Sequence, residues 1–355
     1  MSEVNVAIVG LGTVYEVHKR AILNSAGLKL AAVCDNNLDR LYRAQNDIKS
    51  LNLPYSTSFY SHFDDLLRSG DFHSVHVLLP HDEHIPICER LISTGKNILC
   101  EKPLASSYDE AKKFIQTYRN VSYKNCLCFQ NRYNNSVRLA AKLLRDESFI
   151  DEYGAIRAVT AEVLWKRTED YYKDSEWRGE FLHAGGGAMI NQSIHTIDLL
   201  SYLCGEIAEL RGIVYNLSDY HIDVEDSASA RFKFSSGADG YFHSTVVNSD
   251  NDSVKLSIKL ERAELRISDY RLLLFDFNSN AVEVLTEDDK SIGNKSYYGA
   301  SHERLIRRFY GLETDCFFDG ELLYPELEAG LSSLRFIEAV RLSSQSKKLI
   351  KLKEL

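Results

Sequence analysis

The sequence contains no long apolar run and no excess of basic residues, and both absences restrict what the protein does. None of its 355 residues lies in a stretch that approaches the roughly 18 apolar residues of a membrane-spanning helix. Lysine and arginine number 42 against 51 aspartates and glutamates, so the net charge is −9. A nucleic-acid-binding protein needs a basic face, which this balance disfavours. We therefore expect neither a membrane nor a nucleic acid as a partner.

The N-terminus and the cysteines also lack the patterns of a secreted protein. No basic segment precedes the first apolar run, so we expect no signal peptide. The seven cysteines are odd in number and scattered, without the spacing of a metal site. We expect reduced thiols in a cytoplasmic protein.

The chain is too long for one ordinary core and suits two domains. Its first 120 residues alternate strand and helix patterns, which predicts a doubly wound parallel sheet. Later strand patterns follow one another without helices between them, which predicts a large, mostly antiparallel, open sheet. The sequence thus predicts an α/β protein with a Rossmann domain at 1–123 and a C-terminal α/β domain at 124–355. The closing helices of the second domain could pack back on the first.

A strand, a glycine turn and a helix open the sequence in the order that binds a dinucleotide. Gly10 allows the tight turn, and Gly12 lets the backbone approach a pyrophosphate at the helix N-terminus. Asp35 follows 25 residues after the first glycine (35 − 10 = 25), where an acid binds a ribose 2′-hydroxyl. Tyr15 occupies the third glycine position, which predicts looser packing between helix and strand.

The carboxylate of Asp35 favours NAD as the cofactor, while Arg40 and Arg43 on the next helix leave NADP possible. In open parallel sheets ligands bind beyond the carboxyl ends of the strands, which is where the paired charges of Glu101 and Lys102 fall. Four histidines between residues 73 and 84 lack matching acid or cysteine spacing, so we predict no metal site. The residues predicted to bind the cofactor are Gly10, Gly12, Thr13, Val14, Asp35, Leu79, Pro80, His84, Glu101, Lys102, Gln130, Trp177 and Arg178.

In the second domain, three glycines at 185–187 form a loop that can approach a ligand closely. Asn191, His195 and Asp198 follow at spacings of four and three, so we expect them on one face of a helix. This triplet fits a functional site. It fits equally well a histidine that Asp198 holds for structural reasons.

The chain closely resembles the Gfo/Idh/MocA oxidoreductases, the glucose–fructose oxidoreductase and inositol dehydrogenase family, in the segments GLGTVYEVH, VCD, CEKPLA, NRYN and WRGEFLHAGGGAMINQSIHTIDLL. The resemblance implies an N-terminal Rossmann domain, a C-terminal domain with a large open sheet, and NAD or NADP. It also implies carbonyl–alcohol chemistry on sugars or polyols. Homodimers or homotetramers assembled through the C-terminal sheet are implied as well.

The resemblance matches the family's catalytic lysine to Lys102 and its proton-transferring histidine to His195, and it implies a cis peptide before Pro103. As a hypothesis, His195 is the general base in oxidation and the general acid in reduction, and Lys102 stabilises the developing alkoxide. Asn191, the third catalytic candidate, stands where inositol dehydrogenases have aspartate; it binds a hydroxyl but cannot relay a proton. This moves the expected substrate toward nucleotide-linked sugars. His183 replaces a common aspartate, and we assign it no role.

The sequence therefore predicts an NAD(P)-dependent oxidoreductase that interconverts an alcohol and a carbonyl on a sugar, polyol or nucleotide-linked sugar. Two alternatives remain: a non-catalytic cofactor-binding regulator of the same fold, and a dihydrodiol- or biliverdin-type reductase. Biliverdin is large and apolar, whereas the candidate pocket is polar, which favours a sugar. Weaker candidates for contacting the substrate are Arg132, Tyr171, Tyr172 and Asp198.

Overall fold

The computed structural model describes residues 3–175, 177–289, 301–312 and 324–355. The chain divides into two compact units. Unit 1 comprises Met1–Ala105, Lys113–Gln130 and Ser301–Ala329, and unit 2 comprises Ser106–Lys112, Asn131–Ala300 and Gly330–Leu355.

The two units interleave along the chain, whereas the sequence predicted one boundary between 123 and 124. Helix α11 (Ser301–Phe309) accounts for much of the difference, because it returns to unit 1 and contacts helix α1 (Tyr15–Leu23). Leu305, Ile306 and Phe309 of α11 are fully buried. The other closing helix, α12 (Gly330–Ser346), belongs to unit 2.

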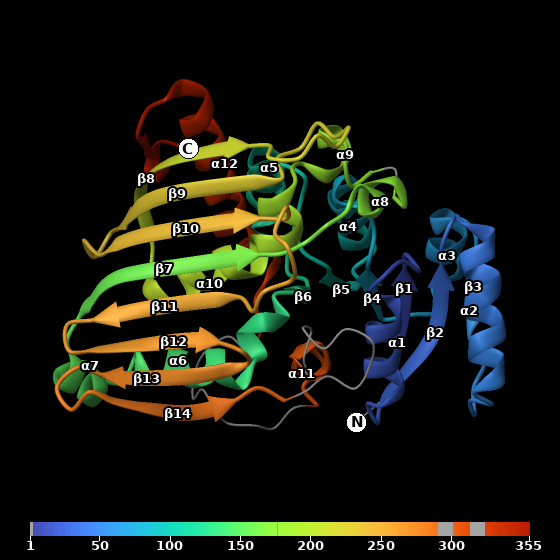
Figure 1. The fold of residues 1–355 in the computed structure, drawn as a ribbon. Helices are drawn as coiled ribbons and strands as arrows, with labels where there is room; N and C mark the ends of the chain where they lie inside the picture. The colour runs from blue at the N-terminus through green and yellow to red at the C-terminus, as the bar shows by residue number, and fades with distance from the viewer. Residues whose placement is uncertain (1–2, 176, 290–300, 313–323) are drawn as a thin grey trace. The chain divides into compact units, whose positions relative to one another are not determined.

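Unit 1 is built on six parallel strands in the order β3-β2-β1-β4-β5-β6, which confirms the predicted doubly wound sheet (Figure 1). The strands are β1 (Val4–Val9), β2 (Leu28–Cys34), β3 (Ser58–Tyr60), β4 (Ser74–Val77), β5 (Asn97–Cys100) and β6 (Asn125–Leu127). The remaining helices are α2 (Leu38–Ser50), α3 (Phe63–Ser69), α4 (His84–Ser93) and α5 (Tyr108–Tyr118), with 3-10 turns η1 (His81–Glu83) and η5 (Leu327–Ala329); α5 begins in unit 2.

Strand β1 shows why this sheet forms. Val6, Ala7 and Ile8 are fully buried in succession, as in a parallel strand that is covered on both faces. Helix α1 buries Ala21 and Ile22 on the side that packs on the sheet. The apolar runs of the sequence therefore become the centre of unit 1.

Unit 2 contains a nine-stranded sheet in the order β14-β13-β12-β11-β7-β10-β9-β8-β15. Among the described strands β7 and β10 run parallel and the other neighbours run antiparallel, which confirms the prediction. The strands are β7 (Ile156–Leu164), β8 (Ile207–Tyr215), β9 (Ser227–Phe234), β10 (Asp239–Thr245), β11 (Lys255–Leu260), β12 (Ala263–Ser268), β13 (Arg271–Asp276), β14 (Ala281–Glu287) and β15 (Ile350–Lys351). The helical elements are η2 (Gln130–Tyr133), α6 (Asn135–Leu143), α7 (Glu147–Tyr153), α8 (Glu169–Lys173), α9 (Phe181–Ala184), the π-helical η3 (Ala188–Ser193), α10 (Ile194–Cys204) and η6 (Leu352–Glu354); Gln130 of η2 belongs to unit 1.

One face of this large sheet is covered and the other is open. Helices α6, α10 and α12 contact the covered face, where Phe232 and Phe242 pack on Phe336 of α12 at ring-centroid distances of 5.5 and 5.6 Å. On the open face Tyr241 and Ile213 are each 46% exposed. A shallow groove follows strands β7 to β10 on this face.

Two expectations about the whole chain can be compared with the structure. None of the six described cysteines takes part in a disulfide bond, and Cys316 lies outside the described residues. In the part of the chain that the structure describes, no helix combines the length and the apolar character needed to cross a membrane.

Candidate functional site

The predicted nucleotide turn connects β1 to α1, and its two glycines are needed for different reasons. Gly10 has a φ of 95°, and a Cβ there would meet the carbonyl of Leu78. At Gly12 a Cβ would meet no atom within 4 Å. The first glycine is therefore required by the protein's own packing, while the second leaves open space over the backbone that a pyrophosphate can approach. Thr13 and Val14 complete the turn before α1 begins.

The carboxylate of Asp35 holds this turn against the end of β2. Its Oδ2 accepts a hydrogen bond from the backbone N–H of Leu11 at 2.7 Å, and its Oδ1 accepts one from Asn37 at 2.8 Å. Each carboxylate oxygen has a second lone pair. Asp35 can therefore hold the turn and bind a ribose hydroxyl at once, which fits the predicted cofactor.

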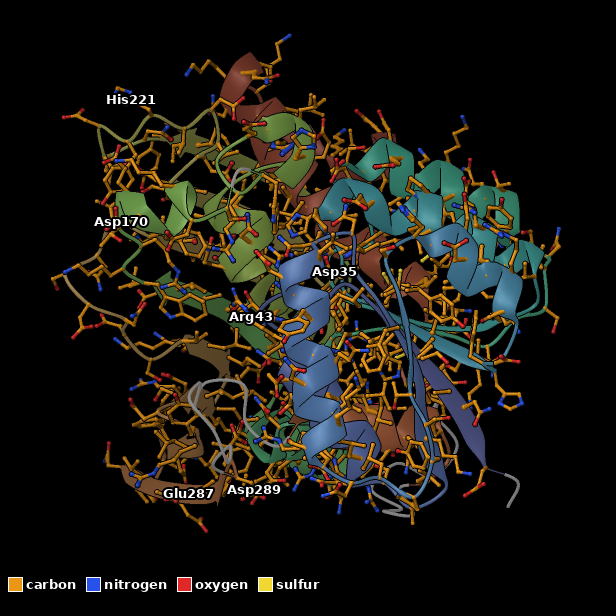
Figure 2. All side chains as sticks on the ribbon, turned by 90° about the vertical axis from the view of Figure 1, so that its right-hand side faces the viewer. Asp35, Arg43, Asp170, His221, Glu287 and Asp289 are labelled. Atoms are coloured by element: carbon orange, nitrogen blue, oxygen red, sulfur yellow. The ribbon has the colours of Figure 1, made fainter. Side chains whose placement is uncertain are left out.

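The two arginines that leave NADP possible differ in their distance from Asp35. Nη1 of Arg40 lies 3.8 Å from Oδ2 of Asp35. Figure 2 shows Asp35 near the start of α2 and Arg43 farther along the same helix. The side chain of Arg40 is 53% exposed, so it can turn toward a ligand.

Tyr15, the departure from the glycine pattern, is the first residue of α1. It is only 5% exposed, and the Nζ of Lys19 lies 5.4 Å from the centre of its ring. Burial raises the pKa of the Tyr15 hydroxyl. The helix therefore accepts a large residue here by burying it at its own N-terminus.

The turn after β5 contains Glu101, Lys102 and Pro103, and the peptide bond before Pro103 is cis, which confirms the prediction. The Glu101 carboxylate is buried and lies 3.0 Å from Nε2 of His18 and 3.4 Å from Nε2 of His302. Burial alone would raise the pKa of Glu101, but these two histidines hold it well below its usual range. The structure places this side chain in the interior of unit 1, and its predicted contact with the cofactor stays a prediction.

Lys102 is partly exposed, in contrast to its neighbour. Burial of its ammonium group lowers the pKa of Lys102, while the negative charge of Glu101 opposes that shift. The sequence did not show which of these two effects on the pKa of Lys102 is larger. In the structure the effect of burial is larger. A lysine with a lowered pKa releases and accepts a proton more readily near neutral pH.

His84, predicted to contact the cofactor, is fully buried at the start of α4. Its Nδ1 lies 2.6 Å from the carbonyl oxygen of Pro103, and its Nε2 lies 2.9 Å from that of Leu79. Both ring nitrogens therefore face backbone oxygens. His84 therefore connects the Lys102–Pro103 turn to the loop after β4, and its predicted contact with the cofactor stays a prediction.

The other histidines of this region lie in different surroundings. Nδ1 of His73 accepts a hydrogen bond from the backbone of Asn5 at 3.0 Å. His76 is bonded to His18 and to Tyr310, each at 3.0 Å. His81 is buried in η1.

In unit 2 the predicted polar triplet is divided between two kinds of helix. Asn191 lies in the π-helical segment η3, whereas His195 and Asp198 lie in α10. The side chain of Asn191 donates to the carbonyl oxygen of Gly186 at 3.3 Å. The expected single face assumed an uninterrupted α-helix, whereas Asn191 lies in a π-helical segment with a different number of residues per turn. Such turns are frequent at functional sites.

Asp198 binds Arg132 and does not orient His195 as the structural alternative supposed. Its two oxygens accept hydrogen bonds from Nε and Nη2 of Arg132 at 2.7 and 2.5 Å. Asp198 is 1% exposed, and the guanidinium of Arg132 also stacks over Tyr202 at 4.5 Å. Arg132 and Asp198, two of the weaker candidates for contacting the substrate, therefore form a bidentate ion pair with each other.

The three glycines before η3 are explained by packing. A Cβ on Gly185 would meet the carbonyl of Ser106, and one on Gly187 would meet the carbonyl of Glu225. Glu225, which the sequence analysis missed, is buried and accepts the backbone N–H of Met189 at 3.1 Å. Its position two residues before β9 gave no periodic signal of this role.

The remaining predicted residues of unit 2 gather around Tyr171. Its hydroxyl accepts from Nε2 of Gln192 at 3.0 Å, and the guanidinium of Arg178 lies 4.6 Å from its ring. Tyr172 packs edge-on against Tyr171 at 5.1 Å, and Trp177 lies 6.0 Å from the same guanidinium. Gln130, the last of the predicted set, is buried in unit 1.

The different roles of Gly10 and Gly12 can be separated by experiment. Gly10→Ala should lower the free energy of unfolding by about 1–3 kcal/mol, because its methyl group meets the Leu78 carbonyl at a left-handed φ. Gly12→Ala should leave the stability of the cofactor-free protein unchanged and weaken NAD binding. Urea unfolding and calorimetric titration with NAD measure the two effects. Equal destabilisation by both substitutions would contradict this assignment.

The buried ion pair between Arg132 and Asp198 should contribute strongly to the free energy of unfolding. Asp198→Asn should lower the free energy of unfolding by about 3–5 kcal/mol, because it leaves the buried charge of Arg132 without compensation. Combining Arg132→Met with Asp198→Leu should recover most of this loss. The exposed Asp170→Asn is the matched control in urea unfolding. A loss below about 1 kcal/mol in Asp198→Asn would mean that water compensates the arginine.

Two family models match the chain. Residues 4–127 match the oxidoreductase family, NAD-binding Rossmann fold, and residues 140–266 match the GFO/IDH/MocA C-terminal domain. Levoglucosan dehydrogenase of Pseudarthrobacter phenanthrenivorans is 27% identical over 154 residues, which is 43% of this chain and 38% of that protein. Rhizopine catabolism protein MocA of Rhizobium meliloti is 27% identical over 207 residues, 58% of this chain and 59% of that protein. These matches span less than two thirds of either relative.

Solved structures with the same fold cover almost the whole chain. Levoglucosan dehydrogenase in complex with NADH and levoglucosan has a TM-score of 0.83 at 19% identity, covering 99% of this chain and 100% of that chain. The WlbA dehydrogenase from Bordetella pertussis, in complex with NADH and UDP-GlcNAcA, has a TM-score of 0.79 at 22% identity and covers 98% of each chain. Since models for both of its domains match, the chain belongs to the Gfo/Idh/MocA oxidoreductase family and contains that family's NAD-binding Rossmann domain.

Proposed function

We propose that the protein is an NAD-dependent oxidoreductase that interconverts an alcohol and a carbonyl on a sugar, a polyol or a nucleotide-linked sugar. One observation carries this proposal. The nucleotide turn held by Asp35 and the turn that bears Lys102 follow the carboxyl ends of strands β1 and β5 of the same parallel sheet. Ligands of such sheets bind beyond those ends.

The cofactor fits the residues of unit 1. Gly10 and Gly12 shape the turn for a pyrophosphate, which the N-terminus of α1 would face, and Asp35 would bind a ribose hydroxyl. When bound, NAD supplies the hydride acceptor in oxidation, and its reduced form supplies the hydride donor. Relatives named as a levoglucosan dehydrogenase and a dehydrogenase in complex with UDP-GlcNAcA support a sugar-type substrate.

In this proposal three side chains handle the substrate oxygens. His195 removes the hydroxyl proton during oxidation and returns it during reduction, because an imidazole titrates near working pH. Lys102 stabilises the negative charge that develops on the same oxygen. Asn191 binds a neighbouring hydroxyl, since its amide can both donate and accept hydrogen bonds.

The expected assembly into dimers or tetramers through the C-terminal sheet stays a prediction. The open face of strands β7 to β10, with Tyr241 and Ile213 half-exposed, is the surface it would use.

Removing the proposed catalytic groups should slow turnover strongly without unfolding the protein. Lys102→Ala should reduce kcat at least about a hundredfold, because a charge that stabilises the transition state is lost. His195→Ala should reduce kcat by a similar factor, because proton transfer typically contributes at least about a hundredfold. The assay follows NADH absorbance with free sugars, inositols and nucleotide-linked sugars.

Matched controls for that assay are Lys113→Ala and His221→Ala, which change exposed residues of the same types. Both should keep near-normal turnover. Near-normal turnover of Lys102→Ala would refute its role. Tight NAD binding without turnover on any compound would instead favour a non-catalytic cofactor-binding protein.

Cofactor choice should depend on Asp35. The unmodified protein should show the higher kcat/KM with NAD, because the carboxylate repels a 2′-phosphate. Asp35→Asn should reduce that preference at least about tenfold, since a hydrogen bond to a charged group is worth roughly 1.5–3 kcal/mol. Asp39→Asn, which changes an exposed acid in the first turn of α2, is the matched control and should change the preference little. A higher kcat/KM with NADP in the unmodified protein would overturn this prediction.

A further inference from the structure

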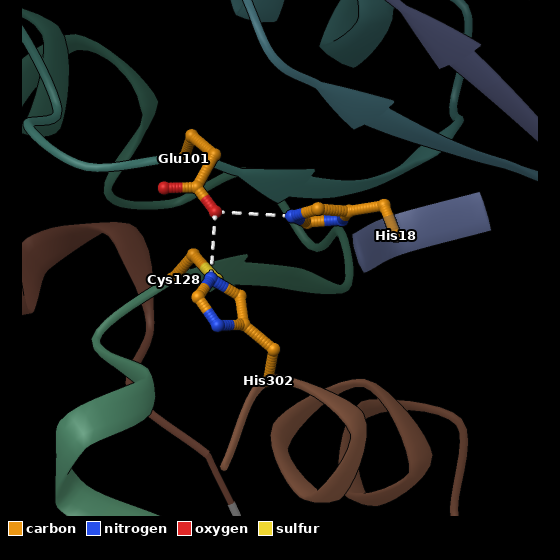
Figure 3. Close-up of side chains that lie close together, drawn as sticks. All are labelled: His18, Glu101, Cys128 and His302. Atoms are coloured by element: carbon orange, nitrogen blue, oxygen red, sulfur yellow. Dashed lines mark hydrogen bonds and ion pairs between the residues drawn. The ribbon is translucent and has the colours of Figure 1, made fainter. Parts of the chain in front are cut away.

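Four potential metal ligands converge inside unit 1, and the proposed oxidoreductase chemistry does not use them together. His18 comes from α1, Glu101 from the end of β5, Cys128 from just after β6, and His302 from α11 (Figure 3). One ligand atom from each lies within 4.8 Å of the others. His18 and Cys128 are fully buried, His302 is 1% exposed and Glu101 is 6% exposed. This group is called the His–Glu–Cys cluster below.

A chain of hydrogen bonds determines which nitrogen of His76 carries a proton. Ser74 Oγ donates to the carbonyl oxygen of Asn97, and the Tyr310 hydroxyl donates to Ser74 Oγ at 2.8 Å. His76 Nε2 lies 3.0 Å from the Tyr310 hydroxyl, whose proton is already committed to Ser74. His76 Nε2 must therefore donate, which leaves Nδ1 of a neutral His76 as an acceptor.

The same chain of donors and acceptors continues into the cluster and determines which nitrogen of His18 carries a proton. Nδ1 of His18 lies 3.0 Å from Nδ1 of His76, so His18 donates through Nδ1. A neutral His18 then has its lone pair on Nε2, which lies 3.0 Å from Oε1 of Glu101. Two lone pairs at this distance repel unless a cation lies between them. Metal-ligating histidines commonly donate through their other nitrogen in this way, which fixes the tautomer and the ring orientation.

We propose that the His–Glu–Cys cluster is a metal site that binds one divalent cation, zinc by its ligand type, through His18, Glu101, Cys128 and His302. Imidazole nitrogen, thiolate sulfur and carboxylate oxygen are the ligands that zinc takes in proteins. Four protein ligands leave no open position, which is the arrangement of a structural site and not of a catalytic one.

The charges and distances of the cluster suit this ion. One carboxylate, one thiolate and two neutral imidazoles carry two negative charges, which a divalent cation neutralises, so burial leaves no net charge. Tetrahedral zinc with bonds of about 2.0–2.3 Å places its ligand atoms about 3.3–3.8 Å apart. The separations of 3.0 and 3.4 Å from Glu101 to the two histidines are within about 0.3 Å of this range, and any pair near the 4.8 Å limit of the set would have to close by about 1 Å when the ion binds.

Such an ion would connect segments that are far apart in the sequence. His302 lies about two hundred residues after Glu101, so the metal would tie α11 to the core of unit 1. It would also hold Glu101 and therefore the backbone that precedes Lys102. The sequence predicted no metal site, because the histidines that stand close together in it are those at 73, 76, 81 and 84. Only His76 has a part here, as the residue that orients His18.

The test begins with the metal content and spectrum of the full-length protein. Mass spectrometry of protein expressed with zinc should find about one zinc per chain. Protein loaded with Co²⁺ in place of zinc should show a thiolate-to-cobalt charge-transfer absorption. Cys128→Ser should lose that absorption and bind the metal at least about tenfold more weakly. Cys88→Ser, which changes another buried thiol of unit 1, is the matched control and should keep both.

A second variant and a melting experiment do not depend on the folding of Cys128→Ser. A chelator should lower the Tm of the unmodified protein, and His302→Gln should bind cobalt more weakly and respond less to the chelator. The proposal is overturned if the unmodified protein contains no zinc, gives no thiolate–cobalt absorption and keeps its Tm with chelator. In that case Nε2 of His18 carries a proton and donates a hydrogen bond to Glu101. Neither result depends on the substrate or on turnover, so this proposal and the proposed function can fail separately.

Discussion

The buried carboxylate of Glu101 is the constraint around which unit 1 is organised. A charge with so little access to water is costly unless other groups compensate it. His18 and His302 face that carboxylate from two different helices, and a proton on them or the proposed metal ion compensates its charge. Because both histidines contact Glu101, these contacts connect α11, α1 and the residue that follows β5. The partly exposed Lys102 follows directly, so the position of the proposed catalytic lysine depends on an interior interaction.

The other buried polar side chains of the site region also have a structural role, because they form hydrogen bonds with backbone groups of the loops. Asp35 anchors the nucleotide turn, His84 joins two loop carbonyls, and Glu225 supports the glycine loop. Buried polar groups that are satisfied in this way make loops rigid. Rigid loops are what a site at the ends of parallel strands needs, since hydride transfer depends on accurate positioning.

Several conclusions were accessible from the sequence because they depend on local patterns. Alternating apolar strands and helices predicted the parallel sheet, and strands without intervening helices predicted the antiparallel one. The glycine turn and Asp35 were recognisable because their spacing reflects one βαβ unit. The cis peptide before Pro103 came from family resemblance and not from the residues themselves. The sequence allowed for a closing helix that packs back on the first domain, as α11 does, but not for the positions at which the units interleave, since these depend on packing between residues far apart in the chain.

By itself the sequence determined the class of the protein: an α/β chain with a dinucleotide turn, a candidate acid for the ribose, and a candidate lysine and histidine. Only the tertiary structure decided what the polar residues do. It directed Glu101 inward, paired Asp198 with Arg132, and placed Asn191 in a π-helical turn. The reason is that periodicity reports which face of an element is apolar. The partner of a buried charge, in contrast, can come from any segment that folding brings next to it, however far away that segment is in the sequence.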